Sequence, residues 1–130
     1  MNPQQNSLQR YQDFVDGLVK RREGVLPDWI RGNGWPHFPE NEQVNTLLSK
    51  LTPEEKDAVA RIAREARDSG IHDTLVFLQE QMDLKGLRLV MDGAELPVSP
   101  HGTEIYWDWG ERADGVPWPA PPADNKPSTS

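Results

Sequence analysis

The C-terminal part of the chain groups side chains that could do acid–base or metal chemistry. Glu104 and Asp108 are four residues apart, so both carboxylates would lie on one face of a helix. Such a pair can act as general acid and base only if one of them is buried beside an aromatic wall. His101 is three residues before Glu104, and His72 precedes Asp73, so nitrogen and oxygen ligands for a divalent metal are also present.

These spacings match no known metal motif, and no other part of the sequence supplies a catalytic one. GxSxG, a P-loop and GxGxxG are all missing, and 32-GNG-34 lacks the strand–turn–helix context that phosphate binding needs. The histidines are better interpreted as surface or capping residues. We therefore predict no catalytic residue, no metal and no cofactor, and the sequence favours a protein that is not an enzyme. A triad assembled in space from distant residues would leave no such motif.

Tryptophan is unusually frequent, with five in 130 residues, three of them in 104-EIYWDWGERADGVPWPAPP-122. Large aromatic side chains anchor interfaces, but they also fill a small core when Leu and Ile are scarce. Core anchoring is favoured, because exposed apolar patches are uncommon in monomers. The candidate surface for a partner or ligand joins this segment to one Trp of the 24–41 loop: Trp35, His101, Glu104, Tyr106, Trp107, Asp108 and Trp109.

Charge and composition narrow the class of protein. The net charge is −7 and most of the acidity is C-terminal, which disfavours nucleic acid as a partner. There is no cysteine, which suits a reducing compartment. No run approaches the roughly 20 apolar residues of a membrane span, and the first residues lack the apolar segment of a secretory signal. We expect a cytoplasmic, bacterial protein without membrane contact.

Hydrophobic periodicity predicts a mostly helical chain. Helices are expected at 7–23, 42–50, 52–69 and 72–83, with one further turn at 28–30. Thr52, Pro53 and Glu55 form a capping box that starts the third helix. Gly70 is expected to end that helix, which predicts an αα-hairpin or a helix–turn–helix-like pair.

The segment 87–98 is predicted to be a β-hairpin, because apolar residues alternate on both sides of Asp92-Gly93. For 104–109 two alternatives remain. A strand would bury Trp107 and Trp109 together, whereas a helix would leave one of them exposed; the helix is slightly favoured. The expected fold is therefore α+β and predominantly α-helical, with four to five helices and the hairpin packed on them. One globular domain is expected over 1–118, followed by a Pro/Ser-rich flexible tail over 119–130.

Two stretches of the chain resemble each other. The first is 11-YQDF-14 followed by 22-REGVLPDW-29, and the second is 106-YWDW-109 followed by 112-RADGVPW-118. The gaps differ, so a duplication is the less favoured explanation. The shared pattern suggests that each aromatic helix is followed by a Trp that folds back on it.

The run 65-EARDSGIHDTLVFLQEQMDLKGLRLVMDGAELPVSPHGTEIYWDW-109 resembles small uncharacterised bacterial proteins grouped as a domain of unknown function. In those proteins a helix leads through a Gly-Ile-His-Asp turn to a second helix and an Asx-Gly hairpin. The resemblance implies no activity and no functional residue.

Three classes of function are compatible with these features. The leading one is a small acidic domain that binds another protein without catalysis, as immunity or inhibitor proteins bind basic partners. The second is a small-ligand binder or enzyme with a pocket between the 24–41 loop and the Trp-rich 104–118 segment. The third is a structural domain that homo-oligomerises. The expected state is a monomer or homodimer.

Overall fold

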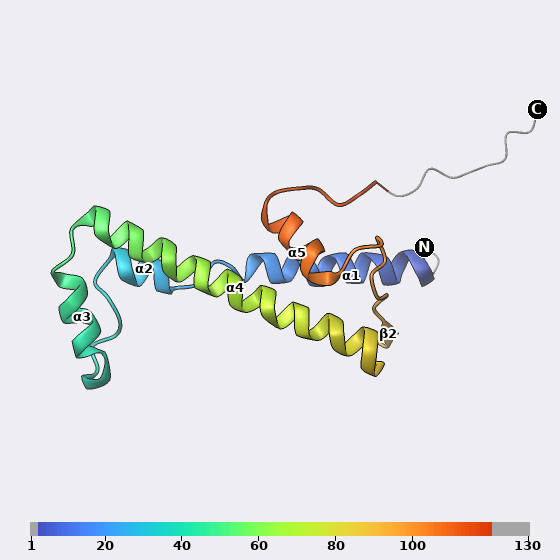
Figure 1. Cartoon of the computed structure of the whole chain (residues 1–130), viewed down its shortest axis with the longest axis horizontal. Coiled ribbons are helices and arrows are strands. Elements are labelled where there is room, and N and C mark those ends of the chain that lie inside the picture. The colour runs from blue at the N-terminus through green and yellow to red at the C-terminus, as the bar shows by residue number, and fades with distance from the viewer. Residues whose placement is uncertain (1–2, 121–130) are drawn as a thin grey trace, which may run out of the picture.

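A computed structural model describes residues 3–120 and confirms a predominantly helical α+β fold with five α-helices and one hairpin. Helix α4 extends along most of the length of the elongated molecule, as Figure 1 shows. The elements are α1 (Pro3–Lys20), α2 (Leu26–Arg31), the 3-10 turn η1 (Pro39–Asn41), α3 (Glu42–Ser49), α4 (Pro53–Lys85), β1 (Val90–Met91), β2 (Ala94–Glu95) and α5 (Ile105–Ala113).

The start of α4 confirms the predicted capping box. The Glu55 amide donates to the Thr52 hydroxyl at 3.1 Å, and the Thr52 amide donates to the Glu55 carboxylate at 3.0 Å. Both bonds satisfy amides that the first turn of a helix leaves without a partner. Hydrogen bonding from the Thr52 backbone amide, and then from the Thr52 side chain, holds the pKa of the Glu55 carboxyl below its ordinary value.

The predicted break at Gly70 is wrong, because α4 continues through it as one helix of 33 residues. A glycine costs a helix only about 1 kcal/mol relative to alanine, and no proline accompanies it here. Packing of both halves of α4 on other elements outweighs that cost, so there is no αα-hairpin and no Gly-Ile-His-Asp turn. The helix ends instead at Gly86, whose φ of +72° is the left-handed conformation that glycine tolerates.

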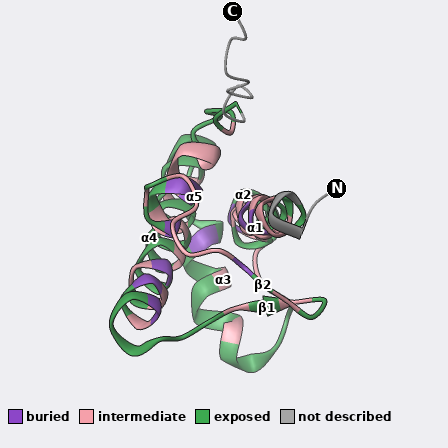
Figure 2. Cartoon of the chain, turned by 90° about the vertical axis from the view of Figure 1, so that its right-hand side faces the viewer, coloured by how far each residue is buried: buried purple, intermediate pink, exposed green. Residues whose placement is uncertain are grey.

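Two hydrophobic clusters lie along α4. Near its C-terminal half, α5 packs against both α1 and α4, and buried residues gather where these helices meet (Figure 2). Near its N-terminal half, α2 packs on α4 and α3 closes the end of the molecule. The first cluster contains Tyr11, Val15, Leu75, Met82, Ile105 and Trp109, and the second contains Ile30, Leu48 and Ala60.

The hairpin confirms the Asp92-Gly93 prediction. β1 pairs antiparallel with β2, Val90 opposite Glu95, and the two turn residues both have positive φ, +50° and +78°. That geometry is the type I′ turn that matches the twist of two short strands.

Two further sequence predictions concern regions beyond these elements. The tail predicted at 119–130 lies almost entirely outside the described residues, and the domain division at 118 stays a prediction. Within residues 3–120, no helix combines the length and apolar content needed to cross a membrane.

Candidate functional site

Helix α5 contains four of the seven candidate residues, and a fifth, Glu104, is its N-cap residue. The segment 104–109 is helical from Ile105 onward, which confirms the favoured alternative over a strand. Trp109 is 4% exposed and belongs to the core, whereas Trp107 is 54% exposed. One Trp therefore lies inside and one outside, as a helix requires when residues two apart point in nearly opposite directions.

Asp108 is buried and holds a polar network inside the core. It is 2% exposed, and its Oδ2 accepts a hydrogen bond of 2.5 Å from the Tyr11 hydroxyl. The Thr103 hydroxyl donates to the other carboxylate oxygen. Burial, and then the hydrogen bond to Asp108, raise the pKa of Tyr11 well above its ordinary value. Because both oxygens are engaged within the protein, Asp108 serves to join α1 to α5 and is not an open acid–base partner for Glu104.

Gln79 fixes the start of α5 from the side of α4. Its Oε1 accepts the Ile105 amide at 2.9 Å, and its Nε2 donates to the Ser99 hydroxyl at 3.1 Å. The amide of a first helical residue has no partner within its own helix, so a buried side chain of another element supplies one. The position and direction of α5 are therefore set by contacts from both neighbouring helices.

Trp118 folds back on this assembly, as the sequence pattern suggested. Its indole N–H donates to Asp16 Oδ1 of α1 at 3.0 Å. Its ring lies 6.0 Å from the Tyr11 ring, 5.3 Å from the His101 ring and 4.2 Å from the Arg112 guanidinium. The similar stretch ending in Trp29 differs, because Trp29 lies within helix α2 and packs on Trp35 instead.

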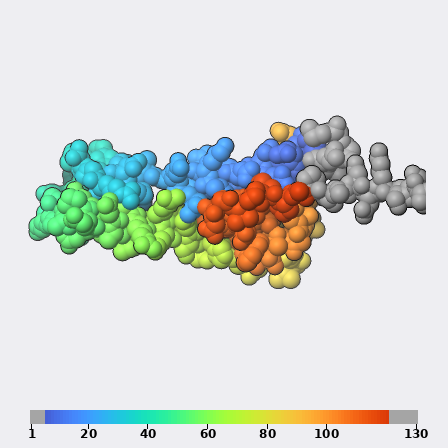
Figure 3. Space-filling model, turned by 90° about the horizontal axis from the view of Figure 1, so that it is seen from above, coloured from blue at the N-terminus to red at the C-terminus, as the bar shows by residue number. Residues whose placement is uncertain are grey.

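The outer side of α5 presents Trp107 between two carboxylates. Glu104 precedes Trp107 by three residues and Glu111 follows it by four, so all three lie on the same side of the helix. We call these residues the Trp107 surface. Tyr106 lies beside it with its ring 5.5 Å from His72 of α4. Figure 3 shows that α5 and the segment after it form a continuous part of one face of the molecule.

The C-terminal part of the chain, which carries this surface, is acidic. Residues 70–120 contain nine Asp and Glu against three Lys and Arg, a balance of −6 out of −7 for the whole chain. A local field of this sign attracts positively charged groups and repels anions.

The structure brings six of the seven candidate residues together and leaves one apart. His101, Glu104, Tyr106, Trp107, Asp108 and Trp109 all belong to α5 or to the loop before it. Trp35 packs in the second cluster instead, where Asn45 Oδ1 accepts its amide at 2.7 Å and Asn45 Nδ2 donates to its carbonyl at 3.0 Å.

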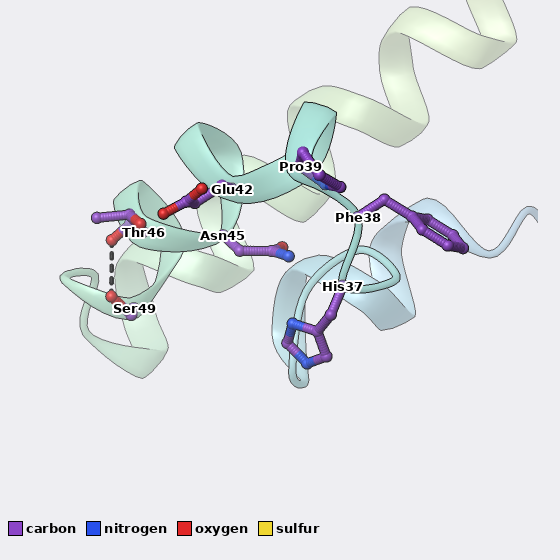
Figure 4. A pocket seen from close by; sticks show the side chains of 7 residues that line it. All are labelled: His37, Phe38, Pro39, Glu42, Asn45, Thr46 and Ser49. Carbon is purple, nitrogen blue, oxygen red and sulfur yellow. Dashed lines mark hydrogen bonds between the residues drawn. The ribbon is translucent and has the colours of Figure 1, made fainter.

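A cavity of about 510 Å³ lies between residues 37–39 and α3. Figure 4 shows His37 and Phe38 turned away from each other on the loop, with Asn45 directed at the loop backbone. The Ser49 hydroxyl donates to the Thr46 carbonyl at 2.6 Å. Its only hydrogen bond within the described residues thus goes to a backbone carbonyl and not to a side-chain base.

The three histidines occupy separate environments. His101 lies 3.2 Å from the Gln12 amide nitrogen, His72 lies 3.6 Å from Asp73, and His37 lines the α3 cavity. Residues 3–120 contain no group of three or more His, Asp or Glu side chains placed to hold a metal ion.

Sequence reasoning missed Tyr11 and Gln79 as supports of α5. Gln79 carries a detectable signal, because it lies four residues after Leu75 and three before Met82, on the apolar side of its helix. A polar residue in such a position needs a buried partner. Tyr11 carries no comparable signal, since it fits the apolar pattern of α1 and its partner is 97 residues away.

Comparison with known sequences gives one match. The sequence model of a family of unknown function (DUF6547) matches residues 4–120, far beyond the run noted from the sequence alone. No curated protein and no solved structure matches the chain.

Proposed function

The chain belongs to this family of unknown function, and we propose that it acts by binding another protein through the Trp107 surface. The observation that carries the proposal is the contrast within one helix turn. Trp107 is 54% exposed while its neighbours Asp108 and Trp109 are almost fully buried. An exposed Trp on a rigid, well-supported helix has the properties of an interface hot spot.

The support beneath Trp107 favours binding with little rearrangement. Asp108 and Gln79 connect α5 to α1 and α4 through buried hydrogen bonds. A side chain held on a fixed backbone loses less conformational entropy on binding than one on a flexible loop. Helix α5 therefore presents its outer side in a binding-ready position.

The charge of the surface indicates the chemistry of the partner. Glu104 and Glu111 flank Trp107, and residues 70–120 carry a balance of −6. The complementary surface is an apolar pocket surrounded by Lys and Arg. Opposite charges around an apolar centre accelerate association and select the partner, as in inhibitor and immunity complexes.

We also propose that the protein works in the cytoplasm of a bacterium. The lack of cysteine in all 130 residues supports a reducing compartment.

The proposal is tested by affinity purification with the wild-type chain and two variants in parallel. Trp107→Ser removes the central aromatic, whereas Phe77→Ser removes another exposed aromatic, 61% exposed on α4. The expected partner is recovered with the wild type and Phe77→Ser and lost with Trp107→Ser. Once it is purified, its association rate should fall as salt concentration rises.

Two outcomes would overturn the proposal. One is that Trp107→Ser and Phe77→Ser recover the partner in equal amounts, whether both still bind it or both have lost it. The other is a molar mass in solution that rises with the concentration of the pure wild-type chain but not with that of Trp107→Ser. That result would assign the surface to homo-oligomerisation.

A further inference from the structure

A second concave site lies between α2 and α4, away from the Trp107 surface. Its volume is about 640 Å³, within the range of small-molecule sites. Figure 1 shows α2 alongside the N-terminal half of α4. Residues 22–24 of the connection from α1 also line the site. The lining is dominated by charged side chains: Arg22, Glu23, Asp28, Arg31, Asp57, Arg61 and Arg64.

Arginines in this groove fall into two groups. Arg22 is committed to the fold, because it donates to both oxygens of Asp68 at 2.8 Å and to the Ala113 carbonyl at 2.9 Å. The hydrogen bond with Asp68 raises the pKa of Arg22 and lowers that of Asp68. Because these hydrogen bonds already engage its guanidinium, Arg22 forms part of the wall and does not serve as a ligand-binding group.

The other arginines keep donors available. Arg31 uses its Nε toward Asp57 at 3.0 Å and Arg61 uses its Nε toward Glu65 at 3.1 Å. Neither side chain has a hydrogen bond from its terminal nitrogens within residues 3–120, and Arg64 has none at all there. Terminal guanidinium nitrogens are the donors that bind carboxylate or phosphate groups through two parallel hydrogen bonds.

The groove also offers acceptors for a second part of a ligand. Glu23 and Asp28 line it, and neither side chain forms an ion pair within the described residues. Carboxylates next to an anion site accept hydrogen bonds from hydroxyl groups. Donors and acceptors in one cavity suit a molecule that has an anionic end and a hydroxylated body.

We propose that this groove binds a small phosphate monoester with a hydroxylated body, such as a nucleoside monophosphate. Arg61 and Arg64 hold the phosphate together with Arg31, and Glu23 and Asp28 accept hydroxyl hydrogen bonds. The proposal uses no residue of the Trp107 surface and does not depend on the protein-binding function.

Isothermal titration calorimetry of the full chain tests the site. The probes are AMP, inorganic phosphate and adenosine, and NaCl is added so that all three titrations have the same ionic strength. AMP should bind, inorganic phosphate should bind more weakly, and adenosine should give no measurable heat. Arg64→Gln and Arg61→Gln should each weaken AMP binding about tenfold or more, the loss expected for one charge-assisted hydrogen-bond donor.

Lys85→Gln is the matched control, because it removes one positive charge at the far end of α4, where the side chain is exposed. It should change AMP affinity less than about twofold, since exposed charges beyond the Debye length of ~8–10 Å are screened. The proposal is overturned if AMP gives no heat at millimolar concentration, or if Lys85→Gln weakens binding as much as Arg64→Gln.

Discussion

Replacing Tyr11 with Phe removes one oxygen atom from the core and leaves the ring in place. The lost group is the hydroxyl that donates to Asp108 Oδ2 at 2.5 Å, between two residues that are each 2% exposed. Thr103 still donates to the other carboxylate oxygen, but Oδ2 keeps no partner. A hydrogen bond to a charged group contributes about 1.5–3 kcal/mol, and burial prevents water from replacing it.

We therefore expect Tyr11→Phe to lower the free energy of unfolding by about 2 kcal/mol and Tm by about 8 °C. Urea titration and calorimetry measure both quantities. Tyr106→Phe is the matched control on the outer part of α5, since its hydroxyl forms no hydrogen bond within the described residues. It should change stability by less than about 0.5 kcal/mol.

The same bond predicts a dependence of stability on alkaline pH. Burial and Asp108 raise the pKa of Tyr11 in the folded state, so its contribution is fully present below the unfolded value of about 10. The contribution is lost as pH rises above 10 toward the folded pKa. Wild-type stability should therefore fall between pH 9 and 11, and more steeply than that of Tyr11→Phe. Equal slopes for the two proteins, or equal effects of Tyr11→Phe and Tyr106→Phe, would refute the reasoning.

Three further predictions concern other parts of the fold. Gly70→Ala should stabilise the protein by about 0.5–1 kcal/mol in urea titration, because an added Cβ at this helical position has no neighbour within 4 Å; a loss of stability would argue against a continuous α4. Gly34→Ala should destabilise it by about 2–4 kcal/mol, since φ is +88° and the new Cβ would lie 2.2 Å from Asn45 Oδ1, which binds the Trp35 amide. A Gly34→Ala protein as stable as the wild type would contradict that geometry. Asp68→Asn should cost stability at pH 7 and less at pH 3, because Arg22 lowers the folded pKa of Asp68, so its contribution is full above the unfolded value of about 4 and declines as pH falls toward the folded pKa. The same difference at both pH values would show that the Arg22–Asp68 pair is not its source.

Much of the local structure followed from the sequence, because the interactions that decide it span only a few residues. Thr52 and Glu55 form their capping box across one helical turn, and Asp92-Gly93 forms a turn from its own backbone preferences. For 104–109 the spacing favoured a helix only slightly over a strand, and the structure shows the helix, with one of its two Trp residues exposed.

The continuity of α4 was not predictable in the same way. Gly70 is locally a weak helix residue, and only packing along both halves of α4 keeps it helical. A local rule for helix ends therefore failed where long-range contacts contributed more than the local cost.

What the sequence determined by itself was thus the class of fold, the capping box of α4 and the turn of the hairpin. The structure decided that 105–113 is a helix, which leaves Trp107 outside and Trp109 inside. Only the tertiary structure decided which residues support Trp107, since Tyr11 and Gln79 reach α5 from other helices. It also separated Trp35 from the other candidates and brought α2 beside the arginines of α4. The physical reason is that these contacts join residues far apart in the chain, and they form only when whole helix faces pack together.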